Sequence, residues 1–165
     1  MKIIIVVLAV LIASLSFAGE IDEVRVYKSK HKMDMLSQGK VIKTYHVMLG
    51  RGGKGPKRQA GDNLVPEGSY TLDYKNSESL FYKSLHVSYP NYEDTRRANE
   101  AGVEPGGDIM IHGYPNKPKA IFKILQKMGL IKRIDWTAGC MAVDNQEMED
   151  IFENIDVPIP ITIFH

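Results

Sequence analysis

The sequence contains a single cysteine, Cys140, among its 165 residues. One thiol cannot form a disulfide within its own chain, and it cannot build a Cys-rich structural metal site. We therefore expect neither feature. Three roles remain for Cys140: a buried structural thiol, an attachment point for another molecule, or a nucleophile. A lipid-bearing cysteine directly follows the cleavage site of an N-terminal signal peptide. Position 140 lies far from the N-terminus, so lipid attachment is disfavoured.

The chain also lacks a large excess of charge of either sign. Lys and Arg total 21, Asp and Glu total 20, and the formal net charge is +1. This balance argues against a dedicated nucleic-acid binder. Basic residues gather in the glycine-rich stretch 51–58, RGGKGPKR, which we interpret as a solvated, mobile loop in preference to an anion-binding rim. It is not a phosphate loop, because Gly55 follows Lys54 where Ser or Thr is required.

Long hydrophobic runs are absent apart from one at the N-terminus. Lys2 precedes an apolar run over 3–13, and small residues stand at Ser16 and Ala18, a pattern typical of a signal peptide at 1–18. The run is shorter than the roughly 20 residues of a membrane span, although retention as an anchor is the alternative to cleavage. We expect export to the periplasm or cell envelope without stable membrane insertion. Residues 19–165 are then expected to form one domain, since no repeat or linker divides them.

Alternation of apolar and polar residues predicts a mainly β domain of the α+β class. Turn residues separate the expected strands and make each of them short. The strands are expected at 23–29, 32–36, 40–49, 68–76, 84–91, 109–112 and 159–164.

Two helices are predicted. The first runs from about Pro118 to Met128, with Asn116 as its N-cap. Its apolar residues are expected to form one buried face: Ile121, Ile124, Leu125 and Met128. The second helix runs from about Asn145 to Asn154, where Asp144 and Glu147 have the spacing of a capping box. Its expected buried stripe is Met148, Ile151, Phe152 and Ile155.

The segment DWTAGCMAV surrounds the thiol with features of a nucleophile site. Gly139 has no Cβ, so a substrate can approach the backbone, and the amides of Gly139 and Cys140 can point at a developing oxyanion. His112 is the best-placed base because it ends an apolar strand and Gly113 follows it. His86 also borders this region. The other histidines are expected on the surface or in packing: His31, His46 and His165.

A strand ending in His-Gly, followed later by Thr-x-Gly-Cys and an apolar strand, resembles the L,D-transpeptidase catalytic domain of the YkuD type. The segments VPEGSYTLDYKN, SLHVSYPN, PGGDIMIHG and DWTAGCMAV follow in the order of its short YafK-like periplasmic branch, so the resemblance spans essentially the whole mature chain. It implies a sandwich-like or barrel-like β domain. It also implies that Cys140 is the nucleophile and that His112 is the general acid and base, oriented by a backbone carbonyl. Substrate contacts are expected from four further candidates: Gly113, Thr137, Trp136 and His86.

Two positions depart from the pattern of this family. Ala138 stands where the family often has His, and Ala142 stands where it often has Arg. Without that Arg, a cation able to bind a carboxylate through two hydrogen bonds is missing. The branch that this chain resembles includes members that hydrolyse cross-links or protein attachments. The substrate mode therefore stays open at this point.

The resemblance implies acyl transfer through a thioester, on peptidoglycan stem peptides and without a metal or other cofactor. Transpeptidation to a second stem or to an anchored protein is the favoured outcome. Hydrolysis of stem peptides, or release of a murein-linked protein, is the alternative, because the two reactions differ only in the acceptor. A third hypothesis is an inactive envelope-binding module in which Cys140 is simply buried. The segment between His112 and Thr137 is expected either to form one wall of the catalytic site or to be a helix that serves only in packing.

Overall fold

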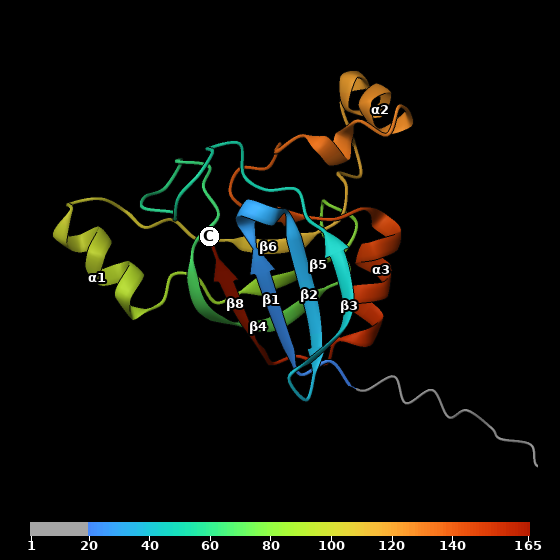
Figure 1. Cartoon of the computed structure of the whole chain (residues 1–165). Coiled ribbons are helices and arrows are strands. Elements are labelled where there is room, and N and C mark those ends of the chain that lie inside the picture. Colours follow the sequence, from blue (N-terminus) through green and yellow to red (C-terminus); the bar gives the residue numbers. More distant parts are fainter. Residues whose placement is uncertain (1–19) are drawn as a thin grey trace, which may run out of the picture.

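The computed structural model describes residues 20–165, so the expected signal peptide at 1–18 lies outside the described residues (Figure 1). In this part of the chain, eight strands form one sheet in the order β3-β2-β1-β8-β4-β5-β6-β7. The strands are β1 (Glu23–Tyr27), β2 (Lys32–Ser37), β3 (Lys40–His46), β4 (Gly68–Asn76), β5 (Ser84–Val87), β6 (Ile109–His112), β7 (Met141–Ala142) and β8 (Ile159–Phe164). The prediction of a mainly β fold is confirmed.

The alternation in the sequence corresponds to one buried face of the central strands. In β1, Val24 and Val26 are fully buried, and in β8, Ile161 and Ile163 are buried, while the residues between them are partly or fully exposed. Strands β1 and β8 pair in parallel, and β4 pairs antiparallel to β8. Because successive side chains point to opposite faces of a strand, this register directs the apolar set of each strand into one core.

The segment after β3 links the two ends of the sheet. Met48 and Ala142 of β7 exchange two backbone hydrogen bonds of 2.8 Å, and Gly50 forms a parallel bridge with Thr137. These contacts curl the sheet into a half-barrel, so the expected barrel-like shape is confirmed. They also place residues 48–51 beside the segment that carries Cys140.

The structure has three α-helices in its described part where two were predicted: α1 (Tyr92–Glu100), α2 (Ala120–Lys127) and α3 (Asn145–Asn154). Helix α1 was missed because its sequence, YEDTRRANE, has no apolar stripe, and its buried residues are only Asp94 and Ala98. Asn91 and Asp94 form a capping box at its start, which is the one local signal that marks this helix.

Helix α3 has the bounds and the capping box that the sequence predicts. The Asp144 carboxylate accepts a hydrogen bond from Glu147 N–H at 2.8 Å, and the Glu147 carboxylate accepts one from Asp144 N–H at 3.0 Å. Met148 and Ile151 are fully buried in the main core. Figure 1 shows α3 lying beside the sheet, away from α1.

Helix α2 corrects the prediction in both its start and its surroundings. It begins at Ala120, and Asn116, the predicted cap, instead accepts a hydrogen bond from Tyr82 N–H and donates one to the Ser79 carbonyl, both at 2.9 Å. None of its residues is buried. Most of the face predicted to be buried is exposed: Ile121 60%, Ile124 53% and Met128 64%. Figure 1 shows α2 projecting from the sheet.

A smaller apolar cluster lies between the base of α2 and the sheet. Its buried members are Met48, Tyr114, Ile131 and Ala142, and the partly buried side chains packed on it are Phe122, Leu125 and Trp136. No α-helix within residues 20–165 is both long and apolar enough to cross a membrane.

Candidate active site

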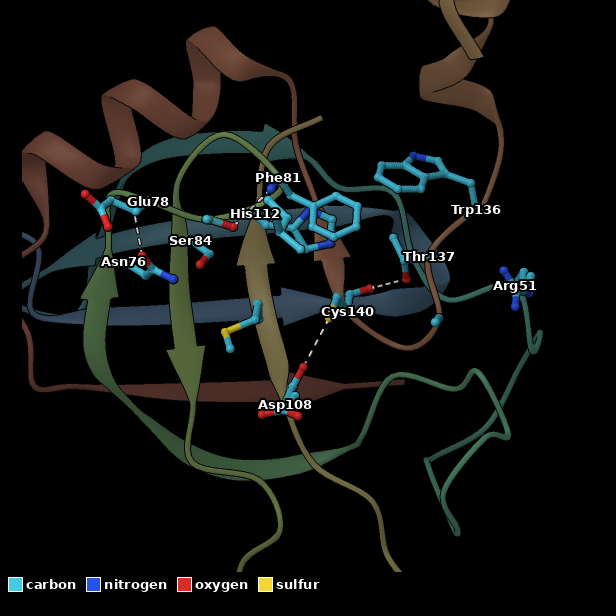
Figure 2. Close-up of a pocket in the computed structure, with 14 residues that line it drawn as sticks. Arg51, Asn76, Glu78, Phe81, Ser84, Asp108, His112, Trp136, Thr137 and Cys140 are labelled. Atoms are coloured by element: carbon cyan, nitrogen blue, oxygen red, sulfur yellow. Dashed lines mark hydrogen bonds between the residues drawn. The ribbon is translucent and has the colours of Figure 1, made fainter. Parts of the chain in front are cut away.

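One cavity of about 480 Å³ is lined by both Cys140 and His112 (Figure 2). Strands β6 and β7 pair in parallel, with Ile111 opposite Met141 and His112 opposite Ala142. Cys140 precedes β7 by one residue, so this register places it on the same side of the sheet as His112. The two residues meet through strand pairing, although 27 residues separate them in the sequence.

The thiol of Cys140 is partly buried and protonated in its resting arrangement. Its Sγ donates a hydrogen bond to the carbonyl oxygen of Asp108 at 3.4 Å. Burial raises the pKa of the Cys140 thiol, hydrogen bonding from the Met110 backbone lowers it, and the Asp108 carboxylate raises it further. The net effect raises the pKa of the Cys140 thiol, and the ordinary pKa of a thiol is already above 7. A base must therefore remove its proton before the thiol can attack a carbonyl carbon.

His112 is buried as a neutral imidazole. Its side chain packs against Phe81 and Trp136, with ring centroids 4.6 Å and 5.6 Å away. Burial lowers the pKa of His112 to about 4, and the hydrogen bond to Gly113 offsets only part of this effect. His112 therefore carries no charge at neutral pH and is ready to accept a proton.

The tautomer of His112 follows from one hydrogen bond. Its Nδ1 lies 2.7 Å from the carbonyl oxygen of Gly113. A carbonyl only accepts hydrogen bonds, so Nδ1 carries the proton and Nε2 has a free lone pair. No hydrogen bond joins Cys140 Sγ to His112 within residues 20–165, because the thiol is turned to Asp108.

Thr137 holds the turn that carries Cys140. Its Oγ1 donates to the Cys140 carbonyl at 2.7 Å and accepts a hydrogen bond from Gly139 N–H at 3.2 Å. Gly139 has a φ of +127°, and a Cβ there would lie 3.0 Å from the Leu64 carbonyl oxygen, so this backbone requires glycine. The Cys140 N–H has no acceptor among residues 20–165. Of the two predicted oxyanion donors, the Cys140 amide is unoccupied and the Gly139 amide is bound to Thr137.

Trp136 and Gly113 have different places relative to the cavity. Trp136 lines it, and its Nε1–H donates to Met48 Sδ at 3.4 Å. Gly113 does not line the cavity; a Cβ at this position would lie 2.7 Å from Asn145 Oδ1, so the glycine permits close packing. Its contribution to the site is the carbonyl that orients His112.

His86 lies outside the cavity, although it is on the neighbouring strand β5. Its Nδ1 is 2.7 Å from Asp73 Oδ1, and its ring stacks on Tyr74 with centroids 4.6 Å apart. It pairs in register with Met110, whereas Ser84 pairs with His112 and lines the cavity. The structure therefore does not bring His86 together with Cys140 and His112.

Several residues that line the cavity were not expected from the sequence. Asn76 ends β4, Glu78 and Phe81 come from the connection between β4 and β5, and Arg51 comes from the basic stretch. No spacing rule connects these segments to Cys140, so the sequence held no signal for them. Within residues 20–165, no group of three or more His, Cys, Asp or Glu side chains is arranged to hold a metal ion.

This fold, with a cysteine and a histidine in one cavity, defines an L,D-transpeptidase-type domain. The chain belongs to the YkuD family, described as the L,D-transpeptidase catalytic domain, which it matches over residues 21–163. A curated relative is "Putative L,D-transpeptidase YafK" of Escherichia coli (strain K12), which is 26% identical over 137 residues, covering 79% of this chain and 45% of that protein.

Solved structures share the fold at low sequence identity. The helical cell shape determining protein Pgp2 from Campylobacter jejuni aligns with a TM-score of 0.60 at 22% identity, over 88% of this chain and 48% of Pgp2. Bd1075 from Bdellovibrio bacteriovorus aligns with a TM-score of 0.60 at 22% identity, over 91% of this chain and 50% of its own. An L,D-transpeptidase from Mycobacterium smegmatis aligns with a TM-score of 0.55 at 12% identity, over 89% and 60% of the two chains. The chain thus spans about half the length of several relatives.

Proposed function

We propose that this chain catalyses acyl transfer on peptidoglycan stem peptides, with Cys140 as the nucleophile and His112 as the general acid and base. The observation that carries the proposal is the shared cavity, in which a thiol directly before β7 and a neutral imidazole with a free Nε2 at the end of the paired strand β6 are held together. Membership of the L,D-transpeptidase family supports the substrate class. A structural relative named as a determinant of helical cell shape also supports a cell-wall substrate.

The first half of the reaction forms a thioester. Nε2 of His112 takes the thiol proton while Sγ bonds to the carbonyl carbon of the diaminopimelate residue. The unoccupied Cys140 N–H donates to the developing oxyanion. The C–N bond then breaks, and the imidazolium returns its proton to the departing amine. Burial of His112 favours this return, because the charged imidazolium is unstable in an apolar surrounding.

The second half depends on the acceptor. An amine from a second stem or from an anchored protein completes transpeptidation, which we favour as the function of this family. Water completes hydrolysis, the second candidate, and two observations favour it. Ala138 lines the cavity without a polar group, and Ala142 is fully buried in the small apolar cluster. Neither position provides a cation that holds a charged acceptor.

We place this reaction in the periplasm or cell envelope, where murein lies. The N-terminal pattern of Lys2 and the apolar run that follows supports export. The alternative of an inactive envelope-binding module predicts that Cys140 never becomes acylated.

The test uses protein lacking residues 1–18, incubated with disaccharide tetrapeptides with and without an added D-amino acid. Mass spectrometry of the products separates the candidates. Exchange of the terminal D-alanine, or formation of dimers, supports the transpeptidase. Tripeptide alone, or release of stems from cross-linked or protein-bound murein, identifies a hydrolase. Absence of any thioester on Cys140 and of any product supports the inactive module and overturns both enzymatic candidates.

A further inference from the structure

Arg51 is the one lysine or arginine that lines the Cys140 cavity among the described residues. Its backbone is fixed beside the nucleophile turn, because Arg51 N–H donates to the Thr137 carbonyl at 3.0 Å and Thr137 N–H donates to the Leu49 carbonyl at 3.1 Å. On its other side, Gly52 N–H donates to the Asn63 carbonyl at 3.0 Å. Arg51 is therefore anchored to the segment that carries Cys140.

The guanidinium of Arg51 has no partner within the described chain. It makes no side-chain hydrogen bond and no ion pair with residues 20–165, and the side chain is exposed. Lys57, in the same basic stretch, is different: it is buried, and its Nζ lies 2.8 Å from Asp62 Oδ1. The expectation of a uniformly solvated loop is wrong at Lys57, whose charge is neutralised inside the protein. Arg51 is left as the cation that faces the cavity.

The other fixed charges in the cavity are negative and lie elsewhere. Glu78 and Asp108 both line it, and His112 is neutral. Figure 2 shows Glu78 and Asn76 on one side of His112 and Arg51 on the other side, beyond Thr137. A carboxylate entering this cavity is attracted at Arg51 and repelled at Glu78 and Asp108. The cavity therefore has one place suited to a substrate carboxylate.

We infer that Arg51 binds a carboxylate at the terminus of the stem peptide and so determines which peptides become acyl donors. This inference rests on the proposed function and names a substrate feature for the same site. The planar guanidinium can bind a carboxylate through two parallel hydrogen bonds. Two carboxylates of the stem adjoin the bond that breaks: the C-terminal carboxylate of the departing D-amino acid and the side-chain carboxylate of diaminopimelate.

The experiment compares three peptides and three variants. The peptides are a disaccharide tetrapeptide, its C-terminal amide, and a tetrapeptide with lysine in place of diaminopimelate. The variants are Arg51→Gln, Arg51→Lys and, as the matched control, Arg58→Gln, which changes an exposed cation of the same stretch that does not line the cavity. Arg51→Gln is expected to lower kcat/KM for the tetrapeptide about 10- to 100-fold, mainly through KM, because a charge-assisted pair is lost. Arg51→Lys is expected to recover part of this loss.

Removing the recognised carboxylate must make Arg51 dispensable. If the C-terminal carboxylate is bound, wild type loses kcat/KM on the amide by the same factor, and Arg51→Gln no longer distinguishes acid from amide. If the diaminopimelate carboxylate is bound, the same behaviour appears with the lysine peptide. Equal kcat/KM for wild type and Arg51→Gln on all three peptides overturns the inference while leaving the proposed function standing.

A binding measurement separates this inference from the failure of the proposed function. In the Cys140→Ala background, isothermal titration calorimetry reports tetrapeptide affinity without turnover. Arg51→Gln in that background is expected to raise Kd about 10-fold or more, and Arg58→Gln is expected to leave it unchanged. A protein that never acylates yet shows this Arg51-dependent Kd refutes the acyl-transfer proposal and retains the carboxylate site. An unchanged Kd rejects the site.

Discussion

The Nδ1–H of His112 donates to the carbonyl oxygen of Gly113, the next residue in the chain, at 2.7 Å. This contact fixes the ring orientation and leaves Nε2 free to accept a proton. As the proposed base, His112 therefore needs no carboxylate partner, because Gly113 provides the orienting group. The glycine itself is required by close packing against Asn145.

Replacement of this base is expected to slow acylation without preventing binding. His112→Gln retains an amide donor for the Gly113 carbonyl but has no basic Nε2. We expect the rate of thioester formation to fall about 100-fold or more, the usual contribution of a positioned general base. Single-turnover mass spectrometry of the acyl-enzyme measures this rate. His86→Gln is the matched control, because His86 lies outside the cavity; a rate lowered by His86→Gln alone would assign the base to His86.

The buried imidazole is also expected to make stability depend on pH. The pKa of His112 is about 4 in the folded chain, against 6.5 as the ordinary value. Between these values the unfolded chain binds a proton that the native protein excludes, so the free energy of unfolding falls as pH decreases through this window. The full contribution, present above pH 6.5, is about 3 kcal/mol. Urea unfolding from pH 4.5 to 7.5 should show this dependence in wild type and a clearly shallower slope in His112→Gln.

Removal of the thiol should abolish chemistry and preserve the fold. Cys140→Ala is expected to eliminate the acyl-enzyme and all turnover, since no other nucleophilic thiol is present in the chain. The unfolding free energy should change little, because a small apolar side chain is tolerated where the thiol is only partly buried. Product analysis and urea unfolding of the same preparation check both parts, and turnover retained on stem peptides would exclude Cys140 as the nucleophile.

The hydroxyl of Thr137 is expected to matter for both turn stability and rate. Thr137→Val leaves the Cys140 carbonyl and the Gly139 N–H without their partner, at a cost of about 1–3 kcal/mol in unfolding free energy. We expect kcat to fall as well, because the backbone next to the nucleophile is no longer held. Thr137→Ser keeps the hydroxyl and should remain close to wild type in both measurements. A wild-type-like Thr137→Val beside an impaired Thr137→Ser would show that the methyl packing matters and the hydroxyl does not.

Helix α2 and helix α3 should respond differently to truncation of apolar residues. Ile124 of α2 is 53% exposed, so Ile124→Ala should change the unfolding free energy by less than about 0.5 kcal/mol. Ile151 of α3 is fully buried, so Ile151→Ala should cost about 2–5 kcal/mol. Chemical denaturation of the two variants measures both values. A large loss for Ile124→Ala would mean that the face of α2 is covered in solution.

Local patterns in the sequence were sufficient for the features that depend on neighbouring residues. The capping box of Asp144 and Glu147 and the apolar spacing after it define α3, because a helix start and its buried stripe are both set within ten residues. The alternation in β1, β4 and β8 defines the sheet for the same reason. The His-Gly and Thr-x-Gly-Cys elements indicated the family and selected His112 and Cys140.

Tertiary structure alone decided what surrounds those two residues. The exposed face of α2 has the same apolar spacing as a buried one, and only the absence of a packing partner distinguishes them. Phe81, which contacts His112, lies in a loop whose sequence has no regular spacing of apolar residues. Arg51 reaches the cavity because residues 48–51 pair with 137–142, and backbone hydrogen bonds between segments so far apart leave no pattern in either segment. Sequence motifs therefore selected Cys140 and His112 as the proposed reactive pair, and long-range pairing determined the charge and the aromatic contacts of their cavity.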